Sequence, residues 1–344
     1  MTRAEIHHVN VGQGDSTLIV TPSEETVLVD TGENPYQRRP GEDPNEIDIE
    51  TTADIDRLFG SHDSFMPGEY LESLDHRSAS GSPIRIDHVV LTHPHEDHQY
   101  YAPDVVEQFE VGTVHVSPVV REHPDVSGDL AVEMDEHGVR LNPVEAGDSI
   151  PVSGVDVDVI APESNPAGLD ADLSAPTGSV ERVDSSSLNR YSLVLNVSHG
   201  HNDVVLPGDA PASQLRTAYD EHGVHPDVVL GSHHLARNGN LLGGDLVHPT
   251  DDLQFVVASH GTNPYGHPHD EVLTELHAQG VPTVSTRVNG CVRYRSDGRD
   301  VEVWVERRTG LDPRRLLGDS PSTDAYPKPG SPEWRGPTWK RICL

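Results

Sequence analysis

Three histidines and an aspartate lie within six positions of this 344-residue chain: His93, His95, Asp97 and His98. The apolar run 86–91 directly precedes them and is typical of a buried strand. Alternate residues of an extended chain share a face, so His93 and His95 should point to one side. Imidazole and carboxylate groups together suit a borderline divalent ion such as zinc. A solvated turn is the alternative, because the chain holds 22 histidines. Strand context, spacing and the neighbouring aspartate favour a metal site.

Two further groups follow apolar runs in the second half of the chain. Asp209 comes after the run 203–206, and the pair His233-His234 comes after 227–230. A loop at a strand end is where a rigid scaffold holds functional side chains. From the residues alone, Asp209 is equally a turn residue of Pro-Gly-Asp. A structural role for the histidine pair is also left open.

The apolar patterning predicts a sequence rich in short strands, with a helix outside the strands of each half. Two sheets packed face to face with helices outside are the natural layering, so we expect an α/β fold. The first three strands, separated by turn residues, predict an antiparallel meander. Strands are expected at 6–11, 17–21, 26–29, 86–91, 113–117, 156–160, 192–198, 203–206, 227–230, 254–259, 283–286, 291–295 and 301–305, and helices at 103–109, 212–222 and 268–279.

The predicted domain spans residues 1–309. A polar segment at about 33–83 is expected to be a surface insertion, with helical stretches near 53–59 and 69–74. Residues 310–344 form a tail rich in proline and glycine, which its tryptophans could dock. No apolar run approaches the roughly 20 residues of a membrane helix, and the N-terminus enters a strand pattern at once. We therefore expect a soluble, cytoplasmic protein with no membrane partner.

The chain is strongly acidic, with 57 Asp and Glu against 24 Lys and Arg and a formal charge of −33. Disorder is one explanation of such a charge, but apolar strand-like runs interrupt the acids throughout. We favour a folded halophilic protein, because at ~1 M salt the Debye length is about 3 Å and self-repulsion is screened. A merely acidic proteome remains the plainer alternative. The two cysteines, Cys291 and Cys343, show neither a disulfide framework nor a metal-ligand spacing.

The segment Thr-His-Pro-His-Glu-Asp-His at 92–98 matches the H-x-H-x-D-H signature of the metallo-β-lactamase superfamily. The chain resembles more closely the metallo-β-lactamase domain of ComEC-type competence proteins and their free-standing soluble relatives. The resemblance implies a four-layer αββα sandwich. Seven further segments resemble that domain in the same order: 10–16, 30–32, 189–195, 207–209, 233–234, 265–269 and 289–298.

The resemblance implies a role for each matching residue. His93 and His95 would bind one divalent ion, and Asp97 and His98 a second. Asp209 would bridge the two ions. His233 or His234 would complete the second site, and we expect His233 as the ligand. The catalytic group would then comprise Asp97, which is also a ligand, together with His234 and His267.

Two departures from the family pattern bear on the metal. The wider superfamily supplies a further histidine to the first ion, whereas this chain offers Asn189 and Ser192. Asparagine is a poorer zinc ligand than imidazole, so the first site is expected either to be weak or to take a harder ion such as manganese. The histidine cluster still makes zinc the favoured ion and manganese the alternative. Leu235-Ala236 also replaces the family's Gly-Ser, which removes a possible substrate contact.

Three neighbouring features have two interpretations each. Gly12-Gln13-Gly14-Asp15 lacks the helix and lysine of a nucleotide-binding loop, so we expect a tight turn. Within it, Asp15 would orient a ligand histidine or be a turn residue, and the same holds for Asp30. His267 and His269 line the pocket or simply begin a helix.

These features predict a metal-dependent hydrolase in which a hydroxide held by the metal attacks the substrate. His234 or His267 would hydrogen-bond the developing oxyanion or protonate the leaving group. The resemblance favours a phosphodiester, with nucleic acid as one candidate, and the net charge does not exclude it in concentrated salt. Two alternatives stay open: a metal-stabilised binding or sensing module without turnover, and a thioester or lactone hydrolase.

Overall fold

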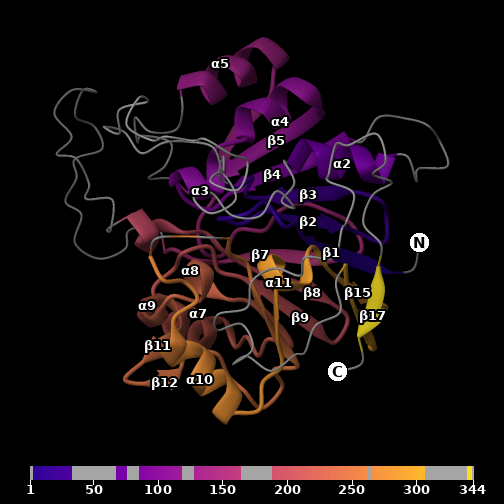
Figure 1. Cartoon of the computed structure of the whole chain (residues 1–344). Helices are drawn as coiled ribbons and strands as arrows, with labels where there is room; N and C mark the ends of the chain where they lie inside the picture. The colour runs from indigo at the N-terminus through magenta and orange to yellow at the C-terminus, as the bar shows by residue number, and fades with distance from the viewer. Residues whose placement is uncertain are drawn as a thin grey trace, which may run out of the picture.

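A computed structural model describes residues 3–32, 67–75, 85–117, 128–163, 188–261, 263, 265–306 and 339–342. Two large sheets dominate it (Figure 1). The first sheet has the order β17 (Lys340–Ile342), β16 (Val301–Val305), β15 (Val292–Ser296), β1 (Ala4–His8), β2 (Thr17–Val20), β3 (Thr26–Val29), β4 (Arg85–Leu91), β5 (Glu110–Val116) and β6 (Arg140–Pro143). The second has the order β14 (Thr283–Ser285), β13 (Phe255–Ala258), β10 (Val228–Leu230), β9 (Asn202–Leu206), β8 (Val194–His199) and β7 (Asp156–Ala161).

Each sheet is antiparallel on one side and parallel on the other. Strands β1, β2 and β3 pair antiparallel, which confirms the expected meander, and β3, β4, β5 and β6 then pair parallel. In the second sheet, β7, β8 and β9 are antiparallel, and β9, β10, β13 and β14 are parallel. Neighbouring parallel strands end at the same edge of their sheet, so the loops that follow them lie together.

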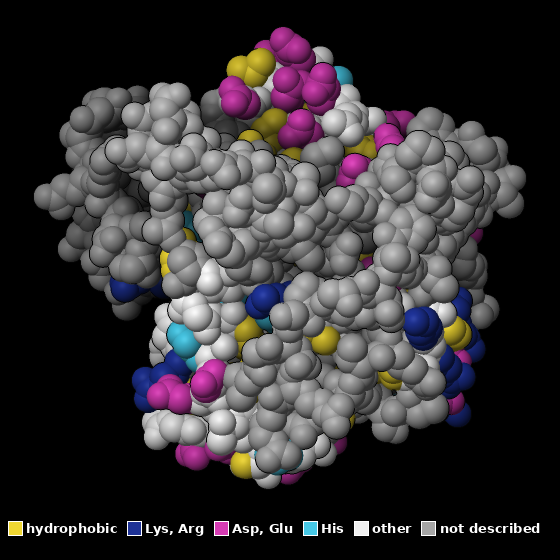
Figure 2. All heavy atoms as spheres, in the orientation of Figure 1, with side chains coloured by type: hydrophobic (Ala, Val, Ile, Leu, Met, Phe, Trp, Pro, Cys, Tyr) yellow, Lys and Arg dark blue, Asp and Glu magenta, His cyan; other side chains and the backbone are white. Residues whose placement is uncertain are grey.

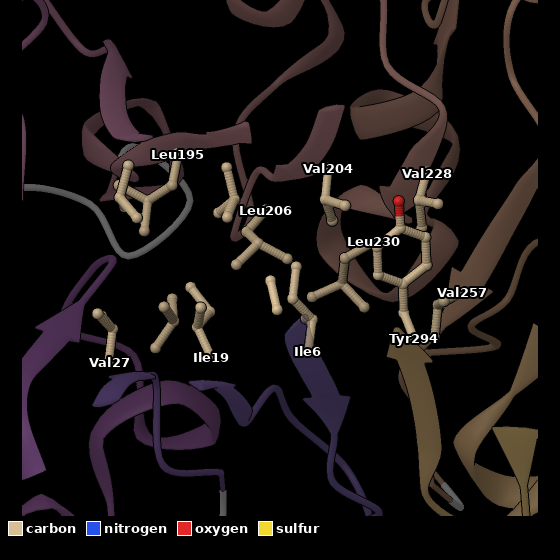
Figure 3. Packing of buried hydrophobic residues seen from close by; sticks show 14 of the residues in the cluster. Ile6, Ile19, Val27, Leu195, Val204, Leu206, Val228, Leu230, Val257 and Tyr294 are labelled. Atoms are coloured by element: carbon tan, nitrogen blue, oxygen red, sulfur yellow. The ribbon is translucent and has the colours of Figure 1, made fainter. Parts of the chain in front are cut away.

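The core between the sheets follows from strand alternation. In β9, Val204 and Leu206 face the first sheet, and Val205 between them faces outward. Ile6 and Ile19 face them from β1 and β2. Figure 3 shows these side chains from the two sheets packing against one another. Burying both faces of the central strands explains why they are rich in valine and leucine.

Helices cover both outer faces of the sandwich. On the first sheet lie α2 (Pro67–Asp75), α4 (Ala102–Gln108) and α5 (Gly128–His137), packed through residues such as Leu71, Val105 and Leu130. On the second lie α7 (Ala212–His222) and α10 (Asp270–Ala278), packed through Leu215 and Leu273. The expected αββα sandwich is therefore confirmed (Figure 1).

Short elements connect these layers near the strand ends. They are α3 (Glu96–Gln99), the 3-10 helix η2 (Asn189–Tyr191), α8 (Ser232–Leu235), α9 (Arg237–Asn240), β11 (Leu241–Leu242), β12 (Asp245–Leu246) and α11 (Thr286–Asn289).

The two segments set apart in the sequence are described only in part. Helix α2 confirms the helical stretch expected near 69–74, whereas the one expected near 53–59 lies outside the described residues. In the tail, β17 pairs antiparallel with β16, and the Trp339 ring lies 4.5 Å from the Arg293 guanidinium carbon. Neither that strand nor β6 was predicted from the sequence. Among the described residues, no helix combines the length and apolar character needed to cross a membrane.

Acidic side chains are conspicuous on the surface. Figure 2 shows Asp and Glu gathered over α5, where Asp129, Asp135 and Glu136 are exposed. Basic side chains gather at the right of this view, near the strands β15 to β17. Several of them are paired with acids, as in Arg3 and Arg341 with Glu302.

Candidate metal centre

Most of the candidate residues come from five loops that meet at one edge of the sandwich. In the first sheet, Asp15 follows β1, Asp30 follows β3, and the segment 93–98 follows β4. In the second sheet, Asp209 follows β9 and His233-His234 follow β10. Figure 1 shows α3, which contains Asp97 and His98, facing α8, which contains His233 and His234. The parallel halves of both sheets thus deliver their loops to one place.

The Asp209 carboxylate is the centre of this cluster and is 2% exposed. Four imidazoles point Nε2 at it from two loops. The Nε2-to-oxygen distances are 3.1 Å for His98, 3.4 Å for His233, 3.5 Å for His93 and 3.9 Å for His234. The backbone N–H of Asp209 donates to the Ser192 hydroxyl at 3.2 Å, which fixes the loop that presents the carboxylate.

Hydrogen bonds around the cluster fix which nitrogen of each buried ring faces inward. The Thr92 hydroxyl donates to Asp30 at 2.7 Å, so it can accept from Nδ1 of His93 at 3.1 Å. Nδ1 of His98 donates to Asp30 at 2.7 Å, and Nδ1 of His234 donates to the Ser259 carbonyl at 2.9 Å. In all three rings Nδ1 takes part in a hydrogen bond, which leaves the inward-facing Nε2 as the atom that could bind a metal ion.

His95 and Asp97 complete two groups of donor atoms. Nδ1 of His95 lies 2.9 Å from Nε2 of His93, so the two rings converge on one position. Asp97 places one carboxylate oxygen 3.0 Å from Nε2 of His234 and the other 4.0 Å from Nε2 of His98. In the structure, His95 therefore lies beside His93, and Asp97 lies beside His98 and His234, with Asp209 close to His93, His98 and His234.

His233 and His267 lie at the open side of the cluster. The His233 side chain is 25% exposed, whereas that of His234 is fully buried. The ring of His267 stands 4.9 Å from that of His233 and 6.1 Å from that of His234. His269 lies farther out, with its ring 4.9 Å from the ring of His267. Its Nδ1 accepts from the backbone N–H of Arg237, so it also anchors a loop.

The ionisable groups of the cluster shift one another's pKa values. Burial alone would lower the pKa of His98, but Asp209, Asp30 and Asp97 outweigh it and raise that pKa well above 6.5. Asp15 and Asp97 raise the pKa of His234 against burial in the same way. Burial would raise the pKa of Asp209, yet the neighbouring His98 and His93 hold it well below 3.8. The buried carboxylates of the cluster therefore favour positive charge beside them.

The donor atoms fit divalent ions. Nε2 of His98 and Oδ1 of Asp209 lie 3.1 Å apart, but neither atom has a hydrogen-bond partner of good geometry among the described residues. Both are buried, and a buried polar atom without a partner is costly. Ligand atoms that converge on one ion leave this pattern. The sets His93–His98–Asp209 and Asp97–His98–His234 each place their ligand atoms within 4.8 Å of one another.

The glycine loop after β1 supports Asp97. The backbone N–H of Asp15 donates to the Asp97 carbonyl at 3.1 Å, and a Cβ at Gly14 would lie 2.2 Å from that oxygen. Gly14 also has a φ of +110°, which favours glycine. The loop is the tight turn expected from its sequence. Its Asp15 carboxylate lies 3.4 Å from Nδ1 of His234, farther than the Ser259 carbonyl.

Asn189 occupies the position where the sequence departs from the wider family pattern. Its amide Nδ2 lies 3.3 Å from Asp209 Oδ2 and 3.3 Å from Nδ1 of His233. The amide thus donates to the central carboxylate. Thr92 and Ser259 were not singled out in the sequence. Thr92 could have been noticed, because it directly precedes the first histidine, whereas the Ser259 carbonyl leaves no trace in a side-chain motif.

Comparisons with known proteins add a family and three structural resemblances. A comparison with curated proteins found no match. Among solved structures, the chain is similar to CmlA, a diiron β-hydroxylase from Streptomyces venezuelae (14% identity, 85% of this chain and 54% of that one, TM-score 0.45). It is also similar to Igni18, a metallo hydrolase from Ignicoccus hospitalis (13%, 82% and 94%, 0.42), and to the metallo-β-lactamase fold protein YhfI from Bacillus subtilis (9%, 82% and 95%, 0.43). The chain thus spans about half the length of CmlA.

All three TM-scores are below 0.5, so family membership rests on the sequence itself. The family model of the metallo-β-lactamase superfamily matches residues 9–317, which is most of the chain and includes all the residues of the candidate metal centre. The chain belongs to the metallo-β-lactamase superfamily.

Proposed function

We propose that this chain is a metal-dependent hydrolase with two divalent ions and a phosphodiester substrate. The observation that carries the proposal is the shared orientation of His93, His98 and His234. Each is fully buried, each engages Nδ1 elsewhere, and each directs Nε2 towards Asp209. A purely structural cluster would not need three rings oriented alike around one carboxylate.

In this proposal His93 and His95 hold one ion, and Asp97, His98 and His234 hold the other. Asp209 contacts both. His234 takes the ligand role first expected of His233, because it is the buried ring with an occupied Nδ1 and an Asp97 contact. Bound divalent ions would supply an activated water and neutralise charge on the attacked group.

The remaining residues of the site bind and orient. His233 and His267 are partly exposed rings beside the ligand cluster, so they can donate hydrogen bonds to a substrate oxygen. Asp30 holds His98 through Nδ1, and Ser259 holds His234. These second contacts keep the Nε2 atoms aimed at the reacting group.

Two observations support an anionic substrate. Arg190 directly follows Asn189, and Arg237 follows the turn that carries His233 and His234; both side chains are exposed. Guanidinium groups suit phosphate oxygens, although Arg237 is shared with Glu271 at 2.8 Å. The resemblance to ComEC-type domains adds the phosphodiester, with single-stranded DNA as the polymer to test first.

A second candidate is a metal-binding module without turnover. The Asn189 amide favours it, because Asn189 donates to Asp209 where the wider family supplies a metal-binding imidazole. A weak ion on the His93–His95 side would leave the other ion bound and the chemistry incomplete.

Metal analysis and a substrate panel separate these candidates. Protein purified in high salt is loaded with zinc or manganese and assayed on bis(p-nitrophenyl) phosphate, single-stranded DNA, a thioester and a lactone. We expect two ions per chain and turnover of a phosphodiester. The double substitution His93→Ala and His95→Ala should abolish turnover, and His115→Ala, at a buried histidine of β5, should not. Bound metal with no turnover of any substrate supports the binding module, and turnover of the thioester or lactone alone overturns the phosphodiester.

A further inference from the structure

The turn that carries the histidine pair has an uncommon backbone. His233, His234 and Leu235 have φ values of 50°, 55° and 60°, so three consecutive residues other than glycine are left-handed. L-residues rarely adopt this conformation, because their Cβ crowds the following carbonyl oxygen. Such a turn persists only where surrounding contacts hold it. Those contacts therefore determine where the two imidazoles lie.

Asn240 clamps the two ends of this turn. Its side-chain Nδ2 donates to the Ser232 carbonyl at 2.8 Å and to the Ala236 carbonyl at 2.6 Å. These residues stand immediately before and immediately after the three left-handed positions. Asn240 is fully buried. Both of its amide hydrogens are used in the clamp, so its Oδ1 must accept from another group.

That group is His248, which is itself buried on the loop after β12. Nε2 of His248 lies 3.2 Å from Asn240 Oδ1, and Nδ1 lies 2.9 Å from the Tyr219 hydroxyl. Burial, and then Arg216, lower the pKa of His248 to about 3, so the ring is neutral and carries one N–H. Because Oδ1 only accepts, that hydrogen must be on Nε2. Tyr219 must then donate to Nδ1.

These hydrogen bonds form a relay in which every donor points the same way: Tyr219 donates to His248, His248 donates to Asn240, and Asn240 donates to the turn. All three side chains are at most 3% exposed, within the apolar layer between α7, α10 and the second sheet. Apolar side chains could fill this space without buried polar groups to satisfy. What the polar relay adds is a fixed position for two backbone carbonyls.

We propose that Tyr219, His248 and Asn240 are positioning residues of the metal centre, which fix the left-handed turn and so hold His233 and His234 against Asp209 and Asp97. The inference rests on the proposed two-ion centre. None of the three residues touches the donor atoms, so their effect must pass through the turn.

The first test compares two substitutions of His248. His248→Phe replaces the imidazole by a somewhat larger apolar ring and removes both hydrogen bonds, whereas His248→Gln keeps a donor and an acceptor. His115→Phe is the matched control at a buried histidine of the first sheet. Zinc affinity is measured by chelator competition, and the visible spectrum of the cobalt-loaded protein reports ligand geometry. We expect His248→Phe to lower the affinity for one of the two ions about ten- to hundredfold and to change the cobalt spectrum. His248→Gln and His115→Phe should stay within about threefold of wild type.

The outcomes distinguish this inference from the proposed function. A wild-type protein that binds no ion overturns both. A wild type with two ions, together with a folded His248→Phe of unchanged affinity and spectrum, overturns the positioning role alone. Equal losses in His248→Phe and His248→Gln also overturn it, because keeping a hydrogen-bond donor and acceptor at this position would then make no difference.

Two measurements cover the case in which His248→Phe does not fold. Tyr219→Phe removes one hydroxyl and should lower the affinity for the same ion by a smaller factor. In wild type, nitrogen-15 spectra of labelled histidine should show His248, assigned by its absence in His248→Gln, as the neutral Nε2–H tautomer from pH 5 to 8. A hydrogen on Nδ1 would reverse the relay and refute the inference.

Discussion

Asp209→Asn tests the proposed centre most directly, because it removes one charge and almost no volume. The carboxylate is 2% exposed and lies 3.1–3.9 Å from four imidazole nitrogens. A unit charge about 4 Å from an opposite charge is worth about 4 kcal/mol at an effective dielectric constant of 20. Since 1.36 kcal/mol is tenfold in rate, the loss of this charge should lower kcat about a thousandfold.

Asp30→Asn is the matched control for this substitution. Asp30 is equally buried and also contacts an imidazole, but it touches His98 through Nδ1, on the side away from Asp209. Loss of a carboxylate that acts through a ligand typically lowers metal affinity or activity about ten- to hundredfold. The kcat of Asp30→Asn should therefore lie between that of wild type and that of Asp209→Asn.

The assay is hydrolysis of bis(p-nitrophenyl) phosphate at saturating metal in high salt, with bound metal counted by elemental analysis. KM should change much less than kcat, because Asp209 is proposed to act on the ions and not on the substrate. If Asp209→Asn loses no more activity than Asp30→Asn, Asp209 is not the central carboxylate and the two-ion arrangement is refuted.

Three further predictions concern metal binding and stability. His93→Ala with His95→Ala should lower metal content and leave the far-UV circular dichroism unchanged; full metal content would exclude these ligands. Raising sodium chloride from about 0.1 to 2 M should raise the Tm, because the Debye length shrinks from about 10 Å to a few Å; a flat or falling Tm would contradict the halophilic interpretation. Burial lowers the pKa of His8 to about 4 and that of His260 to about 3, so the folded protein binds fewer protons than the unfolded chain below pH 6.5. Each histidine should therefore cost about 2 kcal/mol of stability by pH 5, and urea unfolding of the metal-free protein at pH 7.5 and 5 measures this; equal midpoints would count against it.

The layers of the fold follow from local sequence. Segments such as 193–195 and 204–206 are short continuous apolar runs, which is the pattern of a strand whose two faces are both buried. The cluster at 93–98 could also be predicted, because all its residues follow one strand and share one turn. The pairing partners of the strands were harder to predict. Strand β17 joins the first sheet through backbone hydrogen bonds to a segment about 35 residues away, and its three residues carry no strand period.

The roles of His233 and His234 could not be separated from the sequence. The orientation of adjacent side chains depends on the backbone conformation, and here both residues lie in a left-handed turn. None of its left-handed positions is a glycine, so the sequence does not indicate this conformation. Side-chain contacts hold that turn: Asn240, on the following short helix, clamps its ends, and the Ser259 carbonyl, 25 residues along the chain, engages the ring of His234. Ligand types and strand ends are local properties, so the residues alone were enough to predict a metal-binding cluster. Which imidazole lies beside Asp97 depends on hydrogen bonds between loops of both sheets, so that question could be answered only from the folded structure.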